Sequence, residues 1–237
     1  MGSKATDTSS DLIDIYERLL GRYGPQRWWP AESPFEVIIG AILTQSTAWT
    51  NVEKAIGNLK SADVLDPVAL DAIPIDDLAR LIRPSGYYNA KATKVKAFVE
   101  RLNREHGGDL DRLFAIDTTS LRKELLSIHG IGDETADSIL LYAAHRPIFV
   151  IDAYTKRIID RLGLAPSSDS YHAFQLLFMD NLSRDEGMFN EYHALFVRHG
   201  KEVCRKSPKC DVCCLASLPK KRCPFAEGPG DLGVDQG

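Results

Sequence analysis

The chain has 237 residues, of which 44% are hydrophobic and 26% charged, and its formal net charge is −4. These values are typical of a globular protein and exclude fibrous and low-complexity chains. No apolar run is long enough to span a bilayer, and no signal peptide opens the chain. We therefore expect a cytoplasmic protein that has no membrane partner.

The negative total charge hides two basic segments. Residues 83–104 hold six lysines and arginines against one acid, a local charge of +5, and residues 195–225 hold eight against two acids, a local charge of +6. Such runs are usually solvated faces. Two of them in an acidic protein nevertheless favour a polyanionic partner.

The first part of the chain predicts helices. Residues 1–10 are polar and are expected to be disordered, and residues 10–23 have the apolar spacing of an amphipathic helix. Ser33 and Glu36 then form a capping box around Pro34, which is a strong helix start. The following residues are almost wholly apolar as far as Leu43, so this helix is expected at the centre of a core.

Two short helices and a tight turn come next. Asp66-Pro67 and Pro74 each start a short helix. The turn Gly86-Tyr87-Tyr88-Asn89 then leads into a helix that is expected to end near residue 104.

A pair of helices joined by two turn glycines follows. Gly130 and Gly132 stop a helix that begins near residue 119, and Asp133 can cap a second helix through Tyr142. The backbone amides of Ile131, Gly132 and Asp133 can lie bare at the start of that second helix, which would make a phosphate site. The alternative is an ordinary helical hairpin.

The last third is also helical. Asp152 can cap a helix to residue 162, and two further helices are expected over residues 171–182 and 186–198. No alternating strand pattern exceeds four residues, so an all-α protein is predicted. The final residues, 226–237, are expected to be disordered.

All five cysteines fall within residues 204–223, with the spacing C-x5-C-x2-C-C-x8-C. A cluster of this kind in a cytosolic chain indicates a metal centre more often than disulfides. Four thiolates suit zinc or an iron–sulfur centre, and spacing alone favours zinc.

Several of these features together resemble the helix-hairpin-helix DNA glycosylases related to endonuclease III. The shared features are Gly130-Ile131-Gly132, Asp152 one helix later, the Gly86-to-Lys91 turn and the cysteine run. The resemblance implies an all-α, two-domain fold. It places a six-helix barrel at residues 35–147, with the hairpin at about 119–143. A helical domain would comprise residues 11–34 and 148–225, with an iron–sulfur loop at 204–223.

The resemblance also implies base excision by a monomer acting on double-stranded DNA that contains a damaged base, at the nucleoid if the source is bacterial. Asp152 would stabilise the positive charge that develops on the sugar. Gln45 would enter the space left by the extruded base, and Tyr87 would wedge the duplex open. The remaining DNA-binding residues would be Asn89, Lys91, Gly130, Ile131, Gly132 and Asp133.

The endonuclease III relatives hold a [4Fe–4S] cluster in a C-x6-C-x2-C-x5-C run. By this resemblance the ligands here are Cys204, Cys210, Cys213 and Cys223, although the first gap is shorter and the last is longer. Cys214 could replace Cys213, but only the Cys213 register keeps a C-x2-C pair.

The family members that also cleave the backbone carry a nucleophilic lysine where this chain has Glu134. A carboxylate cannot form a Schiff base, which predicts a monofunctional enzyme. Glu134 also matches the 3-methyladenine branch of the superfamily, as do Trp28-Trp29-Pro30, Trp49 and His199-Gly200-Lys201. That likeness implies a base pocket lined by Trp28, Trp29, Pro30, Trp49 and Glu134, with Lys201 approaching it.

Electron-rich rings suit alkylated purines such as 3-methyladenine, which carry positive charge. The members of that branch lack the cysteine run, so this chain combines the features of two branches. Two alternatives remain: an endonuclease III-type enzyme for oxidised pyrimidines with altered or weak activity, and a DNA-binding homologue without catalysis. The bland interpretation of the three tryptophans is that they belong to the core.

Overall fold

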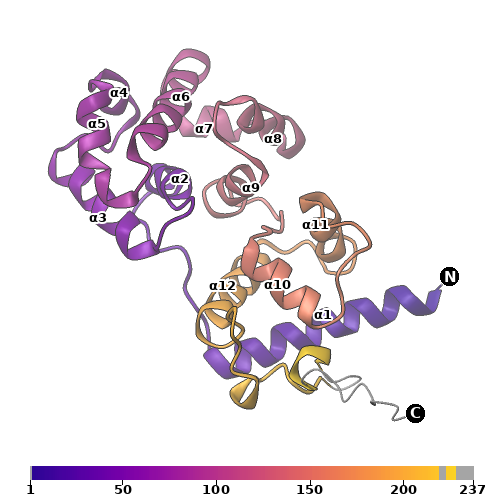
Figure 1. The fold of residues 1–237 in the computed structure, drawn as a ribbon. Helices are drawn as coiled ribbons and strands as arrows, with labels where there is room; N and C mark the ends of the chain where they lie inside the picture. The colour runs from indigo at the N-terminus through magenta and orange to yellow at the C-terminus, as the bar shows by residue number, and fades with distance from the viewer. Residues whose placement is uncertain (1, 219–222, 228–237) are drawn as a thin grey trace, which may run out of the picture. The chain divides into compact units, whose positions relative to one another are not determined.

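The computed structural model describes residues 2–218 and 223–227, and these residues form helices and loops without a β-strand (Figure 1). The all-α prediction is confirmed. The chain divides into two compact units, one of residues 29–146 and one that joins residues 1–28 to residues 147–237. No helix among the described residues is long and apolar enough to cross a membrane.

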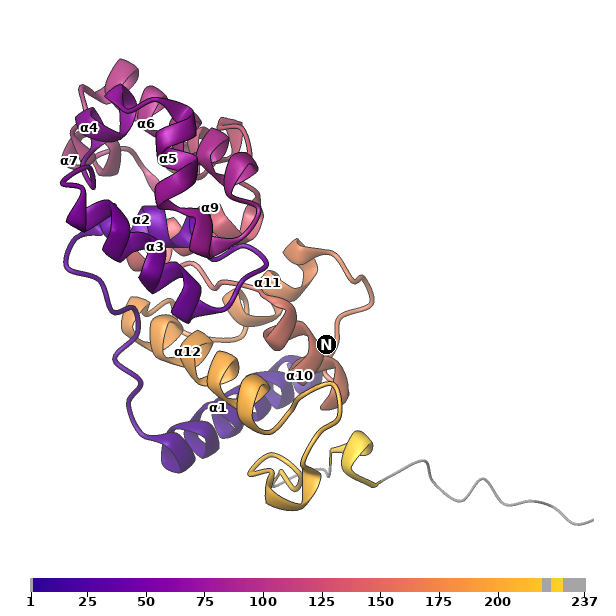
Figure 2. The same cartoon turned by 60° about the vertical axis from the view of Figure 1, so that its left-hand side comes forward.

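The unit of residues 29–146 is built around α2, whose residues from Phe35 to Leu43 are all buried. Ser33 caps its start as predicted, because Ser33 Oγ accepts from the Glu36 N–H at 3.2 Å, but the Glu36 carboxylate accepts from the Glu32 N–H rather than completing the capping box at Ser33. Helices α3, α6 and α9 pack around α2 (Figure 2). The elements of this unit are α2 (Pro34–Leu43), α3 (Trp49–Ser61), α4 (Pro67–Ala72), α5 (Ile75–Leu81), η1 (Arg83–Ser85), α6 (Tyr88–His106), α7 (Leu110–Phe114), α8 (Thr118–Ser127) and α9 (Asp133–Tyr142).

The other unit has α12 at its centre, packed against both α1 and α10 (Figures 1 and 2). Its core is aromatic: the rings of Phe149 and Phe178 stack with centroids 3.8 Å apart, and Tyr192 stacks on Phe196 at 4.6 Å. Its elements are α1 (Gly2–Tyr23), α10 (Ala153–Arg161), α11 (Tyr171–Met179), α12 (Glu186–Glu202), η2 (Cys210–Val212) and η3 (Pro224–Glu227).

The N-terminus differs from expectation, because α1 begins at Gly2 rather than near residue 10. Residues 3–9 include neither proline nor glycine, so nothing in them stops the helix. Residues 2–10, which were expected to be disordered, thus lie within α1 in this structure. Of the predicted C-terminal tail, residues 226 and 227 lie in η3, and residues 228–237 lie outside the described residues, as do the basic residues 220–222.

Candidate active site and DNA-binding hairpin

The predicted hairpin is formed by α8, α9 and the turn between them. Gly130 has φ +83°, and a Cβ there would overlap the aliphatic part of the Lys94 side chain, so both backbone and packing require glycine. Gly132 is the N-cap of α9 and offers no side chain to bond the amides of its first turn. Both Gly132 and Asp133 are exposed, which leaves this helix start accessible to an anion.

One of the three predicted amides is not bare. The Ile131 N–H donates to the Ile128 carbonyl at 3.1 Å, and the Ile131 side chain is buried. The prediction that Ile131 binds phosphate through its amide is therefore wrong, because this N–H closes the turn. Any anion contacts of the backbone fall to Gly132 and the residues after it.

An arginine on the first hairpin helix bonds to two aspartates on the second. Arg122 of α8 donates to both carboxylate oxygens of Asp137 on α9, at 2.7 and 3.0 Å, and to Asp133 at 2.7 Å. The Asp137 side chain is fully buried. The hydrogen bond to Asp137 is the main cause that raises the pKa of Arg122, which stays charged. This ion pair holds the two hairpin helices together.

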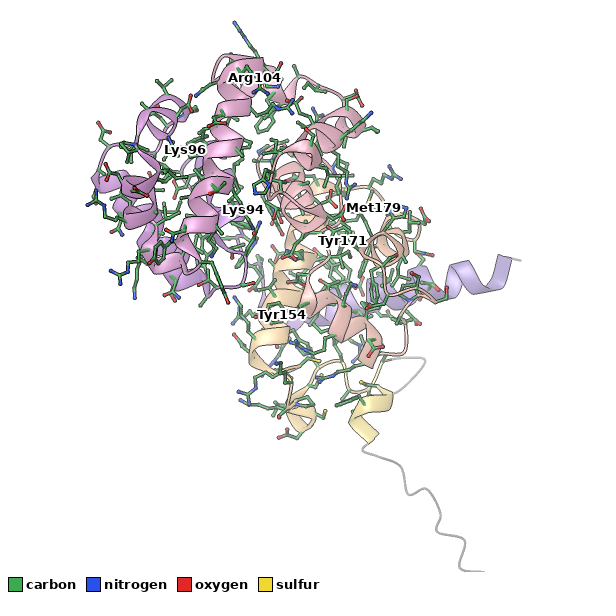
Figure 3. All side chains as sticks on the ribbon, turned by 45° about the horizontal axis from the view of Figure 1, so that its top comes forward. Lys94, Lys96, Arg104, Tyr154, Tyr171 and Met179 are labelled. Atoms are coloured by element: carbon green, nitrogen blue, oxygen red, sulfur yellow. The ribbon has the colours of Figure 1, made fainter. Side chains whose placement is uncertain are left out.

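Gln45 lies just after α2, and its side-chain amide bonds to the hairpin through Nε2 and to α6 through Oε1. Its Nε2 donates to the Gly130 carbonyl at 3.3 Å and to Thr135 Oγ1 at 2.9 Å, while Lys94 donates to its Oε1. Lys94 projects from α6, where Figure 3 labels it. The structure thus places Gln45 beside the hairpin that is predicted to bind DNA.

Lys91 does not face a phosphate, which corrects the sequence-based prediction. Its side chain is buried, and its Nζ donates to the carbonyls of Leu43 at 2.8 Å and Ser85 at 2.6 Å. Burial, with the nearby charge of Lys94, lowers the pKa of Lys91 to about 8. The amine caps the C-terminal end of α2, because a buried cation must satisfy its hydrogen bonds inside the protein.

Tyr87 and Asn89 are both exposed, as a DNA-contacting pair must be. The Tyr87 side chain is 76% exposed, and its backbone has φ +46°, an unusual angle for a residue with a side chain. This turn therefore presents an aromatic ring to solvent from a strained backbone.

Trp29, Pro30 and Trp49 line one pocket of about 440 Å³ in the unit of residues 29–146. The rings of Trp29 and Trp49 meet edge to face with centroids 5.0 Å apart, and Tyr142 lies 5.1 Å from Trp29. Trp28 belongs to the other unit, and Glu134 is exposed in the first turn of α9, so neither lines this pocket.

The same pocket is also lined by charged side chains that the sequence analysis missed. Glu53 accepts from Trp49 Nε1 at 2.9 Å, and Lys60 pairs with Glu32 at 3.0 Å and Glu36 at 2.9 Å. The three carboxylates exceed the one lysine, so the pocket carries a negative charge. The four-residue spacing from Trp49 to Glu53 is the one signal that could have linked them.

Asp152 is the N-cap of α10, as predicted, and its side chain is only 12% exposed. Its Oδ1 accepts from the Thr155 N–H at 2.7 Å, and its Oδ2 lies 3.6 Å from Nε2 of buried His193 on α12. Burial alone would raise the pKa of Asp152. The close contact with His193, together with the Thr155 N–H, outweighs burial, and the pKa of Asp152 lies below its usual value.

The His199-Gly200-Lys201 motif lies at the end of α12. A Cβ on Gly200 would overlap the ring of Tyr154, so this glycine permits the close approach of α10 and α12. Lys201 is exposed. His199 is buried between the Tyr23 hydroxyl, at 2.9 Å, and Cys213 Sγ, at 3.5 Å. Burial lowers the pKa of His199 to about 4, so the ring is neutral.

Four cysteines line one cavity: Cys204, Cys210, Cys213 and Cys223. Arg161 contacts two of them, through Nη1 to Cys204 Sγ at 3.4 Å and through its carbonyl to Cys223 Sγ at 3.2 Å.

Cys214 is not among the lining residues of this cavity. Its carbonyl accepts from Arg18 of α1. Burial raises the pKa of the Cys214 thiol above its usual value, and the positive charges of Arg22 and Arg18 on α1 offset only part of this rise. The structure thus groups the four cysteines of the predicted register and directs Cys214 toward α1.

Comparisons with known proteins identify the family. Residues 39–184 match the HhH-GPD superfamily of base excision DNA repair proteins. A Methanocaldococcus jannaschii protein described as a DNA repair glycosylase is 50% identical over 204 residues, which cover 85% of this chain and 92% of that protein. Endonuclease III of Sulfolobus acidocaldarius is 33% identical over 188 residues, 78% of this chain and 81% of the relative. The chain belongs to the HhH-GPD superfamily and is thus a member of the base excision DNA glycosylases.

Solved structures show the same fold. The 3-methyladenine DNA glycosylase of H. pylori, bound to 1,N6-ethenoadenine, superposes with a TM-score of 0.70 at 27% identity over 84% of this chain and 97% of its own. A trapped covalent intermediate of endonuclease III with DNA superposes with a TM-score of 0.78 at 22% identity, over 92% and 97%. The second likeness concerns the fold alone.

Proposed function

We propose that this protein is a monofunctional DNA glycosylase that hydrolyses the N-glycosidic bond of a damaged base extruded from duplex DNA. The observation that carries the proposal is the buried, ionised carboxylate of Asp152 at the start of α10. As the bond to the base lengthens, positive charge develops on the sugar, and a fixed anion beside it lowers the barrier. The same carboxylate can position the attacking water.

We also propose that the protein does not cleave the DNA strand after it has removed the base. Glu134 occupies the position of the lyase lysine, and a carboxylate cannot form the Schiff base that strand cleavage needs. Lys201 is exposed at the end of α12 and is the amine that would have to replace it.

The test uses a duplex with one damaged base, labelled on the damaged strand. We expect free base and an intact strand that breaks only after alkali, with no adduct trapped by borohydride. Efficient trapping that disappears in Lys201→Ala would contradict monofunctional catalysis and identify a displaced lyase lysine. Trapping that persists in that variant would assign the nucleophile elsewhere and equally contradict the proposal.

For the substrate, we propose an alkylated purine such as 3-methyladenine. The pocket between Trp29 and Trp49 combines electron-rich rings with the carboxylates of Glu32, Glu36 and Glu53, and both favour a cationic base. A panel of duplexes with alkylated, deaminated and oxidised bases tests this. Faster release of a neutral damaged base would contradict the alkylated-purine preference and leave the hydrolytic proposal standing.

A second candidate is an endonuclease III-type enzyme for oxidised pyrimidines. It is favoured by the cysteine cavity and by the relative at 33% identity that bears that name. Release of oxidised pyrimidines together with strand cleavage would support it over the leading proposal.

We propose that the hairpin binds the DNA backbone at the start of α9, and that the protein acts as a monomer. Lys94 beside the turn and the basic faces of α6 add positive charge there. Affinity for DNA should fall steeply as salt rises despite the net charge of −4, because binding releases counterions from the phosphates. A salt-independent affinity measured by fluorescence anisotropy would exclude this mode.

We propose that Cys204, Cys210, Cys213 and Cys223 hold a [4Fe–4S] cluster. They line one cavity, and four cysteine thiolates are the usual ligand set of such a cluster. The cluster would hold the loop in place, without redox chemistry in the reaction.

The cysteine register gives a matched test. The purified protein should be yellow-brown with about four iron atoms per chain, by analogy with four-thiolate ligation. Cys213→Ser should lose the colour and the iron, and Cys214→Ser should keep both. A colourless protein with stoichiometric zinc would contradict the cluster, and the opposite result in the two variants would move the register to Cys214.

A further inference from the structure

His193 of α12 lies against the catalytic carboxylate, and nothing in the motif pattern marks it. Its imidazole is buried, and its Nε2 lies 3.6 Å from Oδ2 of Asp152. We propose that His193 is a positioning residue that orients the Asp152 carboxylate for base excision, an inference that rests on the proposed function of Asp152.

The first argument is geometric. Asp152 Oδ1 is fixed by the Thr155 N–H at 2.7 Å, so a contact on Oδ2 determines the rotation of the whole carboxylate group. An N-cap aspartate with a single contact retains freedom about its side-chain bonds. His193 removes that freedom on the side that the helix cap leaves open.

The second argument is that His193 itself is held rigidly. The preceding residue, Tyr192, donates its hydroxyl proton to the Leu12 carbonyl at 2.7 Å and stacks on Phe196. Gly200, later on α12, allows Tyr154 of α10 to pack against that helix. The two helices that carry His193 and Asp152 are therefore locked at close range, which a catalytic pair requires.

The third argument is chemical. A carboxyl group taken out of water tends to keep its proton, and a neutral acid cannot stabilise a cationic sugar. The groups that act on Asp152 are His193 from α12 and the amide and hydroxyl of Thr155 from α10 itself. Without His193, burial would dominate and the pKa of Asp152 would rise. The active, ionised fraction would then fall first at low pH.

The experiment compares two replacements of His193. His193→Gln keeps an N–H donor near the position of Nε2, and His193→Leu keeps the volume without a donor. Single-turnover base release is measured from pH 4 to 8, about the range in which carboxyl and imidazole groups titrate, with DNA affinity measured separately.

We expect His193→Leu to slow base release by about tenfold or more, the rate equivalent of one pKa unit of interaction. The acid limb of its pH profile should move to higher pH while DNA affinity stays unchanged. His193→Gln should retain most of the rate, and His193→Leu added to Asp152→Asn should cause no further loss. If His193 served only the fold, its replacement would not shift the acid limb of the pH profile or lower the rate while leaving DNA affinity unchanged.

Two results would overturn the proposal: a wild-type rate and acid limb in His193→Leu, or equal losses in the Leu and Gln variants. If His193→Leu does not fold, or if the protein releases no base at all, the proposal is tested instead by an NMR pH titration of the Asp152 carboxyl ¹³C signal. A titration midpoint in the wild-type protein at or above the usual value of about 3.9 would contradict the pair. That measurement needs no substrate, so it separates this proposal from the proposed function.

Discussion

The hairpin and the Asp152 site achieve their geometry in opposite ways. At the hairpin the groups proposed to bind DNA belong to the main chain, and Gly132 has no side chain that could cover them. At Asp152 the proposed catalytic group is a side chain, and its orientation depends on Thr155 and His193. Adding a side chain at Gly132 should therefore impair the hairpin site, whereas removing a partner side chain should impair the carboxylate site.

The two regions also differ in how far along the chain their parts are separated. The turn, its glycines and the first residues of α9 are neighbours in sequence, whereas His193 comes from α12, well after Asp152. A local motif can specify a backbone site, but a buried side-chain pair exists only after distant helices have packed.

The largest expected effect tests the carboxylate. Asp152→Asn should lower the rate of base release by about a hundredfold or more, because the charge acts when the sugar becomes cationic. Asparagine is as good a helix cap as aspartate, so the unfolding midpoint and DNA affinity should change little. Single-turnover kinetics and anisotropy on one lesion duplex provide the comparison. Normal turnover in this variant would reduce Asp152 to a helix cap.

The next effect concerns the ion pair inside the hairpin, where the chain offers its own control. Asp137 and Asp133 both bond to Arg122, but the Asp137 side chain is fully buried and that of Asp133 is 52% exposed. Asp137→Asn should cost about 2 kcal/mol of unfolding free energy, because a buried charge-assisted bond is weakened.

Asp133→Asn should cost no more than about 0.5 kcal/mol, because its partner contact is exposed to solvent. Urea unfolding of both variants gives the two values. Equal losses would mean that burial gives the Asp137 contact no advantage over the exposed Asp133 contact.

The two hairpin glycines sharpen the comparison further. Gly130→Ala should cost about 1–2 kcal/mol, because φ is +83° there and the new methyl group meets the Lys94 side chain. At Gly132 the space is open and φ is −98°, so alanine adds no strain and should cost less, about 0.5 kcal/mol, because alanine is a poorer N-cap than glycine.

DNA affinity should show the reverse order for bulky replacements. A large side chain at Gly132 should cover the start of α9 and weaken DNA binding while the fold survives. Unchanged affinity in such a variant would remove the hairpin from the DNA interface.

Much of this could be predicted from the sequence, and the failures have physical reasons. The helices, the Ser33 cap and the Asp152 cap could be predicted because they follow from local preferences. Lys91 was misplaced because the motif shows that a lysine is present but not which way it points. The Ile131 amide was misplaced because turn closure depends on backbone angles rather than residue type.

The sequence also contained a signal for the buried ion pair of Asp137, although no prediction was based on it. It is an acid beside Ala136 on the apolar side of α9, and a buried acid needs a cation, which Arg122 supplies. His193 carries no such signal, because a histidine can be buried in its neutral form and does not then require a charged partner. The sequence can thus flag a misplaced charge, but it cannot pair two residues whose proximity is a result of the fold.

Among the smallest expected changes in stability is the one at Tyr87, which is expected to be a gain rather than a loss. Its ring is 76% exposed, so removing it loses little packing, and its φ of +46° is an angle that glycine adopts without strain. Tyr87→Gly should therefore raise the unfolding free energy by about 0.5 kcal/mol, the strain relieved less the added freedom of the unfolded chain. If the ring wedges the duplex open, the same change should weaken binding to a lesion duplex by about 1 kcal/mol, the low end of a base–aromatic stack. Tyr87→Phe keeps both ring and strain and should change neither quantity. A stability gain without a loss of binding would leave the ring without a role in the duplex, and a stability loss would show that the turn needs the tyrosine for folding.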